Sequence, residues 1–129
     1  MDTLKKILIV DDDSFLLDMY ALKFTQAGYV VDTALGPKIC LEKLRGGFVP
    51  DILLMDIVMP EMDGFEMLEV INTEGLIPHT IKIVLSNRGQ SADVARGQAL
   101  GVSGYIVKAN TTPTEVIGRV AEIITTKKS

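Results

Sequence analysis

The chain has 129 residues, 47% of them hydrophobic and 23% charged, with a formal net charge of −4 at pH 7. This is the balance of an ordinary globular protein, without the basic stripe of a nucleic-acid-binding protein or the ~20-residue apolar run that spans a membrane. The single cysteine, Cys40, excludes an internal disulfide and suits a reducing compartment, so we expect a cytoplasmic protein.

Short apolar runs alternate with helical patterns along the chain, which is typical of repeated βα units around a parallel sheet. We expect five strands, at residues 5–10, 29–34, 51–56, 80–86 and 103–108. Within 5–10 and 51–56, the runs Ile7–Val10 and Ile52–Met55 are entirely apolar, as strands covered by helices on both faces must be. Asp32 and Thr33 interrupt the run at 29–34, which favours a strand at the edge of the sheet.

Helix-end signals occur in every interval between these runs. An apolar stripe that includes Leu17 and Phe24 predicts a first helix closed by Gly28. The later helices are indicated by Pro37 and Gly46 for the second, Asp63 and Glu66 for the third, Ser91 as the cap of the fourth, and Thr112 with Glu115 for the fifth. The five units use the whole chain, so we expect one domain, residues 1–129, with no output domain.

Four of the predicted strands end on residues that can handle a phosphoryl group. The first ends at Asp11–Asp13, the third at Asp56, the fourth at Ser86 and the fifth at Lys108. Ligands of open parallel sheets bind beyond these carboxyl ends. Successive acids repel one another, and Mg²⁺, which prefers carboxylate and phosphate oxygens, relieves that repulsion. The simplest competing interpretation is that one acid only caps the following helix.

If the first and third strands are neighbours, Asp56 emerges beside the acids that end the first strand. A carboxylate held near Mg²⁺ can attack phosphorus and form an aspartyl phosphate. Lys108 would then neutralise phosphoryl oxygens across the site. The sequence therefore predicts a phosphoryl-transfer site.

The segments ILIVDDD (7–13), PDILLMDIVMPEMDG (50–64) and GYIVK (104–108), together with Ser86, resemble the receiver domain of two-component response regulators of the single-domain chemotaxis type. The resemblance implies a flavodoxin-like (βα)5 fold with strand order 2-1-3-4-5. It also implies that the protein accepts a phosphoryl group from a histidine kinase or phosphotransfer protein. Such a domain is not an enzyme beyond its own phosphorylation and dephosphorylation.

The resemblance also assigns roles to individual residues. The implied catalytic residues are Asp56 as phosphoacceptor, Ser86 and Lys108. The implied Mg²⁺ ligands are Asp12 directly, Asp11 largely through water, Asp56, and the backbone carbonyl of Val58. Ser86 and Tyr105 are the implied switch residues, which reshape the face formed by the fourth helix, fifth strand and fifth helix for an unnamed downstream protein. We expect a monomer or a phosphorylation-dependent homodimer, with no nucleic-acid or membrane partner.

The chain departs from the family pattern at three positions. Asn87 stands where a small residue usually follows the switch hydroxyl, and it could crowd the phosphoryl group. Val58 offers no polar side chain two residues after the phosphoacceptor. Ala109 replaces the proline that usually follows the lysine, so we expect the Lys108–Ala109 peptide to be trans.

Three other functions are compatible with parts of this pattern. Asp11 and Asp13 superficially give the D-x-D of an aspartate-nucleophile phosphohydrolase, although the chain has no length for a cap domain. A flavodoxin-type flavin carrier shares the fold, but the acids would repel the flavin phosphate. The protein could also be a receiver-like interaction module that is never phosphorylated, which only a phosphorylation assay distinguishes.

Overall fold

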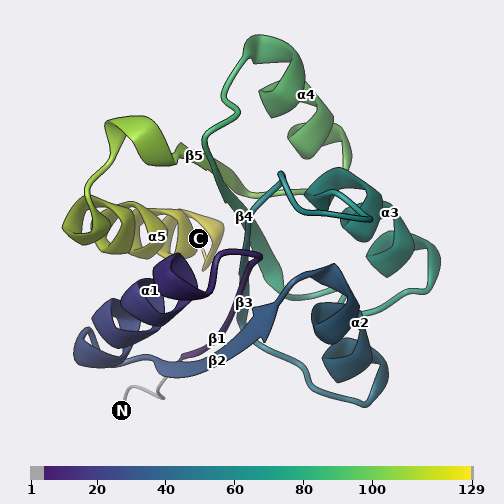
Figure 1. Cartoon of the computed structure of the whole chain (residues 1–129), viewed down its shortest axis with the longest axis horizontal. Helices are drawn as coiled ribbons and strands as arrows, with labels where there is room; N and C mark the ends of the chain where they lie inside the picture. Colours follow the sequence, from purple (N-terminus) through teal and green to yellow (C-terminus); the bar gives the residue numbers. More distant parts are fainter. Residues whose placement is uncertain (1–4, 129) are drawn as a thin grey trace.

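The computed structural model describes residues 5–128. The chain forms a five-stranded parallel sheet in the order β2-β1-β3-β4-β5, which confirms the predicted flavodoxin-like topology (Figure 1). The strands are β1 Lys6–Asp11, β2 Val30–Leu35, β3 Ile52–Met55, β4 Ile81–Ser86 and β5 Gly104–Val107. The predicted edge strand is therefore at an edge, and β1 and β3 are neighbours.

Five α-helices cover the two faces of the sheet. They are α1 Ser14–Gln26, α2 Pro37–Arg45, α3 Gly64–Thr73, α4 Ser91–Ala99 and α5 Pro113–Lys128, and a short 3₁₀ turn, η1 Lys108–Asn110, precedes α5. Helices α1 and α5 lie on one face, and α2, α3 and α4 lie on the other (Figure 1). None of the helices described is long and apolar enough to cross a membrane.

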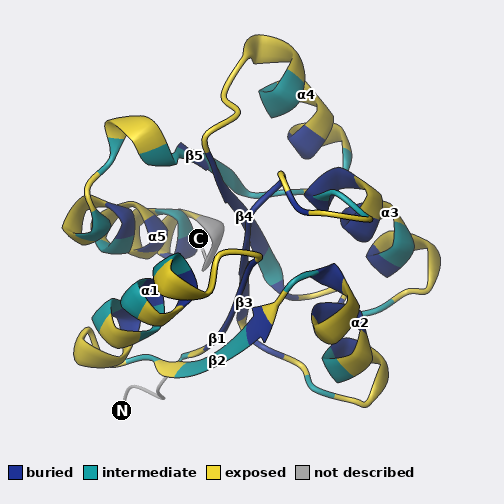
Figure 2. Ribbon diagram, in the orientation of Figure 1, coloured by how far each residue is buried: buried dark blue, intermediate teal, exposed yellow. Residues whose placement is uncertain are grey.

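The central strands are buried from both sides, so alternate residues of one strand belong to different halves of the core (Figure 2). Leu8 and Val10 of β1 pack in the cluster that includes α2 and α3. Ile7 and Ile9 pack in the cluster that includes α1 and α5. These apolar strands hold the carboxyl edge of the sheet in place, because burying a side chain of this size contributes roughly 1.5–3 kcal/mol.

The helix caps follow the sequence signals with one exception. Asp63 and Glu66 form the predicted capping box of α3, with each side chain accepting a hydrogen bond from the other residue's backbone amide. The prediction that Ser91 caps α4 is wrong, because the helix begins one residue earlier. Gln90 is the N-cap and Asp93 closes the box, so Ser91 is already helical.

Helix α4 is held less deeply than its neighbours. Among its nine described residues only Gly97 is buried. A Cβ atom at Gly97 would lie 3.1 Å from Val102 and 3.5 Å from the ring of Tyr105. The missing side chain therefore lets β5 and the loop that precedes it approach the helix closely.

Lys82 is a charged residue inside β4, and only 6% of it is exposed. Its Nζ donates to the carbonyl oxygens of Ile77 at 3.0 Å and Thr80 at 3.3 Å. Ile77 has a positive φ of 42°, which a β-branched residue adopts only under strain. Burial lowers the pKa of Lys82, and its ammonium group holds the strained loop that precedes β4.

Candidate functional site

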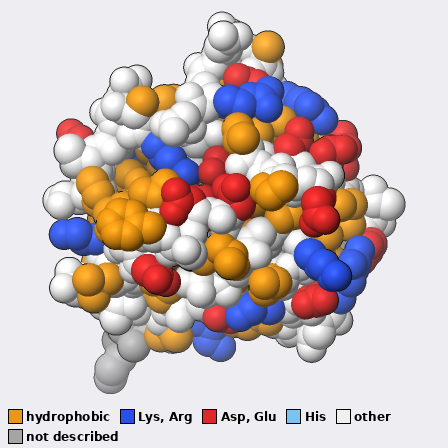
Figure 3. Space-filling view, viewed as in Figure 1, with side chains coloured by type: hydrophobic (Ala, Val, Ile, Leu, Met, Phe, Trp, Pro, Cys, Tyr) orange, Lys and Arg blue, Asp and Glu red, His pale blue; other side chains and the backbone are white. Residues whose placement is uncertain are grey.

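The ends of β1, β3, β4 and β5 meet at one edge of the sheet, as the topology requires. Figure 3 shows acidic side chains gathered near the middle of this face, with a hydrophobic patch beside them over the start of α1. Asp11 ends β1, Asp56 directly follows β3, Ser86 ends β4 and Lys108 directly follows β5. The structure thus brings together the four positions that the sequence predicted.

Asp11, Asp12 and Asp56 form a compact carboxylate cluster, with one oxygen from each lying within 4.8 Å of the others. Asp11 and Asp56 are buried, while Asp12 is exposed at the rim. Burial raises the pKa of Asp12, and the charges of Asp11 and Asp56 raise it further, against a lowering backbone hydrogen bond. The cluster therefore carries mutual repulsion that a cation would relieve.

Asp13 has a different task from the other acids. Its Oδ1 accepts the backbone amides of Phe15 at 3.0 Å and Leu16 at 3.1 Å, so it is the N-cap of α1. The capping alternative that the sequence left open applies to this residue. It does not account for Asp11 or Asp12.

Lys108 joins the two buried carboxylates. Its Nζ lies 2.8 Å from Asp11 Oδ2 and 3.1 Å from Asp56 Oδ2, and the lysine side chain is 9% exposed. Burial opposes the charge, but the hydrogen bond to Asp11 and the nearby carboxylates outweigh it and raise the pKa of Lys108. Three carboxylates facing one ammonium leave a net charge of about −2, which a divalent cation balances.

The main chain fixes Asp56 on its other side. Asp56 Oδ1 accepts the amide of Ile57 at 2.7 Å, and the amide of Val58 lies 3.4 Å away. Gly64 packs directly against this turn, because a Cβ there would lie 2.4 Å from the Asp56 carbonyl oxygen. This role of Gly64 was not predicted from the sequence, although a glycine directly after the capping residue of α3 is a signal of close backbone approach.

The predicted switch residues both contact the loop between β4 and α4. Ser86 is fully buried, and its Oγ accepts the amide of Arg88 at 3.2 Å. The Tyr105 hydroxyl donates to the carbonyl oxygen of the same Arg88. Burial, followed by the charge of Asp93, raises the pKa of Tyr105. Neither contact was foreseen from the sequence, where Arg88 had no assigned structural role.

The donor set suits a hard cation. Carboxylate oxygens are the ligands that Mg²⁺ prefers, and it retains waters and phosphate oxygens at the remaining positions. Val58 is 55% exposed, which leaves space beside the acids. The residues present therefore fit the cation that the sequence implied.

The loop after Lys108 is compatible with alanine in place of proline. The Lys108–Ala109 peptide is trans, as predicted. Residues Lys108–Asn110 form the 3₁₀ turn, and the Thr111 hydroxyl donates to the Val107 carbonyl oxygen at 2.8 Å. Lys108 still reaches both carboxylates from this backbone.

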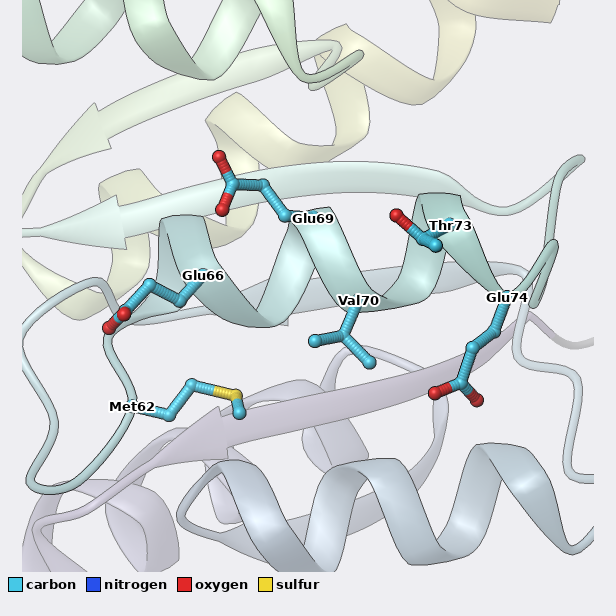
Figure 4. A pocket seen from close by; sticks show the side chains of 6 residues that line it. All are labelled: Met62, Glu66, Glu69, Val70, Thr73 and Glu74. Atoms are coloured by element: carbon cyan, nitrogen blue, oxygen red, sulfur yellow. The ribbon is translucent and has the colours of Figure 1, made fainter.

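A separate hollow of about 360 Å³ lies on the outer face of α3, away from the carboxylate cluster (Figure 4). It contains three glutamates, each of which has a partner elsewhere. Glu66 belongs to the capping box, Glu69 faces Arg96 at 3.8 Å, and Glu74 forms a two-bonded ion pair with Arg45. These acids take part in helix capping and ion pairs, and none of them belongs to the carboxylate cluster at the strand ends.

Comparison with known proteins gives one consistent family. The family model described as the response regulator receiver domain matches residues 7–121. The chain is 38% identical over 105 residues to the chemotaxis protein CheY of Thermotoga maritima, covering 81% of this chain and 85% of that protein. It is 33% identical over 120 residues to the Regulator of RpoS of Escherichia coli, covering 93% of this chain. The chain spans 34% of the length of that relative.

Solved structures give the same fold. The chemotaxis protein CheY4 of Vibrio cholerae aligns with a TM-score of 0.84 at 26% identity, covering 94% of this chain and 99% of that one. A CheY-like receiver domain from Methanospirillum hungatei aligns with a TM-score of 0.84 at 29% identity, covering 98% of each chain.

Proposed function

Because the chain belongs to the family of response regulator receiver domains, we propose that Asp56 accepts a phosphoryl group from a histidine kinase or a histidine phosphotransfer protein. The family match confirms the resemblance predicted from the sequence motifs. Receiver domains are signalling modules that interact with such donors and with downstream targets, and they are generally not enzymes. The observation that carries the proposal is the position of Asp56, which lies 3.1 Å from Lys108 and within 4.8 Å of the acids that end β1.

The chemistry follows from the groups around Asp56. A carboxylate oxygen of Asp56 forms a bond to phosphorus while the phosphorus–nitrogen bond of a phosphohistidine breaks, and the imidazole leaves with that bond's electron pair. The Lys108 ammonium lies 3.1 Å from Asp56 and faces the negative charge that arrives with the phosphoryl group. Burial of both side chains strengthens this attraction, because water screens it less.

We assign the Mg²⁺ site to Asp12, Asp11, Asp56 and the Val58 carbonyl. When bound, Mg²⁺ neutralises the carboxylate cluster and the phosphoryl oxygens. Asp12 stands at the exposed rim, where a hydrated cation can reach it, and Asp11 is already held by Lys108 at 2.8 Å. This difference supports Asp12 as the direct ligand and Asp11 as the residue that acts through water.

The proposed signal is a shift between two conformers, in which the phosphoryl group favours the conformer with Ser86 and Tyr105 turned inward. Both residues already share Arg88 as a hydrogen-bond partner, which supports their coupling. The face formed by α4, β5 and α5 would then present a changed surface to a downstream protein. Cytoplasmic location, the lack of an output domain, and phosphorylation-dependent dimerisation stay predictions from the sequence.

Incubation with acetyl phosphate and Mg²⁺, followed by intact-mass measurement, tests the proposal. Wild type should gain one phosphoryl mass, and Asp56→Asn should gain none. Asp13→Asn is the matched control, because asparagine is also a good N-cap and the cluster at Asp56 is untouched. An equal phosphoryl mass on Asp56→Asn, or none on wild type, would contradict the assignment.

The intact-mass assay and a phosphomonoester turnover assay together decide between the remaining alternatives. An unphosphorylated interaction module would gain no phosphoryl mass in the presence of Mg²⁺. A phosphohydrolase would release phosphate from a phosphomonoester over many turnovers. A receiver instead takes up one phosphoryl group on its own aspartate and must lose it before it can accept another.

A further inference from the structure

Arg88 is the residue through which the two switch side chains are connected. Its amide donates to Ser86 Oγ at 3.2 Å, and its carbonyl oxygen accepts the Tyr105 hydroxyl. Both bonds involve the main chain of a single residue in the loop between β4 and α4. Any displacement of that residue therefore changes the partners of both side chains at once.

The Arg88 side chain is anchored independently of its main chain. Its Nη2 donates to Asp93 Oδ1 at 2.9 Å, and its guanidinium carbon lies 5.9 Å from the centre of the Phe65 ring. The Asp93 side chain is 14% exposed and also accepts the Gln90 amide at 3.3 Å. The guanidinium group is thus held by the first turn of α4 and by the start of α3.

Tyr105 depends on the same region for its ring. The ring lies against Gly97, where an added Cβ would be 3.5 Å from Tyr105 Cδ2. Gly97 is one helical turn after Asp93, on the helix that Arg88 contacts. The position of α4 and the position of the Arg88 carbonyl together define the place that Tyr105 occupies.

We propose that Arg88 is a positioning residue for the switch. Its ion pair with Asp93 and its contact with Phe65 hold the loop of residues 87–90 where the main chain can accept the Tyr105 hydroxyl. The coupling of this position to phosphorylation rests on the proposed function of Asp56, but the positioning itself is a property of the unphosphorylated protein.

Fluorine NMR of protein labelled with 3-fluorotyrosine tests the positioning directly. The chain has three tyrosines, so Tyr105→Phe identifies the resonance of interest by its loss. In Arg88→Ala the Tyr105 resonance should shift toward that of a solvated fluorotyrosine, while the other two remain in place. Half-exposed ion pairs and cation–π contacts are weak, so we expect a roughly three- to tenfold fall in the ratio of bonded to solvated Tyr105.

Matched variants separate positioning from a general loss of structure. Asp93→Asn keeps an oxygen for the Gln90 amide but removes the charge, and it should shift the Tyr105 resonance in the same direction. Arg88→Lys should restore part of the wild-type position, and the double variant Arg88→Ala with Asp93→Asn should add little to either change. Arg119→Ala on α5 should shift nothing. A Tyr105 resonance that stays at its wild-type position in Arg88→Ala overturns the proposal.

Beryllium fluoride with Mg²⁺, used as a phosphoryl analogue, tests the coupling to Asp56. With the bonded Tyr105 as the inward conformer that the phosphoryl group favours, linkage requires that a variant with less bonded Tyr105 binds the analogue more weakly, by at most the same roughly three- to tenfold factor. Unchanged affinity in Arg88→Ala overturns the coupling. If wild type itself binds no analogue, the proposed function fails, and the fluorine spectra still decide the positioning role.

Discussion

Replacing Asp12 with asparagine should stabilise the protein in the absence of Mg²⁺. The carboxylate oxygens of Asp12, Asp11 and Asp56 lie within 4.8 Å of one another, and two unit charges at 4.8 Å repel by about 0.9 kcal/mol in a water-like dielectric. Asp12 is exposed, so this low figure applies to it. Two repelling neighbours and one attracting ammonium, Lys108, then leave roughly 1 kcal/mol of repulsion.

The pH dependence has a definite sign. The folded-state pKa of Asp12 is raised above 3.8, so the folded protein binds this proton more tightly than the unfolded chain does. That contribution to stability is fully present below pH 3.8 and is lost as the pH rises through the folded-state pKa. At neutral pH wild type lacks this contribution to stability. Asp12→Asn mimics the protonated side chain at every pH, so the variant keeps the contribution.

Thermal unfolding at pH 7, in chelator and then in excess Mg²⁺, measures both halves of this prediction. In chelator the midpoint of Asp12→Asn should rise by about 4 °C, the shift that roughly 1 kcal/mol produces in a domain of this size. In Mg²⁺ the midpoint of wild type should rise and that of the variant should respond much less. Asp18→Asn, an equal change on the exposed side of α1, is the control. A lower midpoint for Asp12→Asn in chelator would refute the repulsion argument.

Three further changes test other parts of the fold. Lys82→Met should lower the free energy of unfolding by about 1–3 kcal/mol, because the carbonyl oxygen of Thr80 loses its ammonium partner in the interior and that of Ile77 keeps only the Thr80 amide at 3.2 Å. An unchanged urea midpoint would show that water replaces the ammonium. Gly118→Ala on α5 should raise the same free energy by about 1 kcal/mol, since nothing lies within 4 Å of the added methyl group, and no gain would contradict the helix-propensity argument. Asn87→Ala should accelerate loss of the phosphoryl mass from the phosphorylated protein, and an equal or slower loss would show that Asn87 does not obstruct the attacking water.

The fold was predictable because its strongest signals are local. A strand buried on both faces needs an uninterrupted apolar run, and β1 and β3 have such runs. The strand order then places Asp56 beside Asp11 without further information. Helix ends were predictable where the capping residue has few competitors, as with Asp63. The start of α4 lies one residue before the predicted position, because Gln90 caps the helix in place of the expected Ser91.

The contacts that the sequence did not predict depend on backbone and loop positions that are set only in the folded chain. Nothing local indicates that Lys82 is buried, since its partners are backbone oxygens of the preceding loop. The contact between Arg88 and the Phe65 ring also depends on how two loops meet after folding. Lys108 was expected to bind phosphoryl oxygens, and its bridge between Asp11 and Asp56 became evident only from the assembled sheet edge.

The shallow seating of α4 also has an evolutionary consequence. Gly97 is its only buried residue among the nine described, and the contacts of α4 with α3 are carried by side chains such as Arg96, which lies 4.7 Å over the Phe65 ring. Most substitutions on this helix therefore alter surface chemistry without opening a cavity in the core. The proposed recognition surface can therefore change by substitution at little cost to folding, while the sheet edge and its carboxylates stay the same.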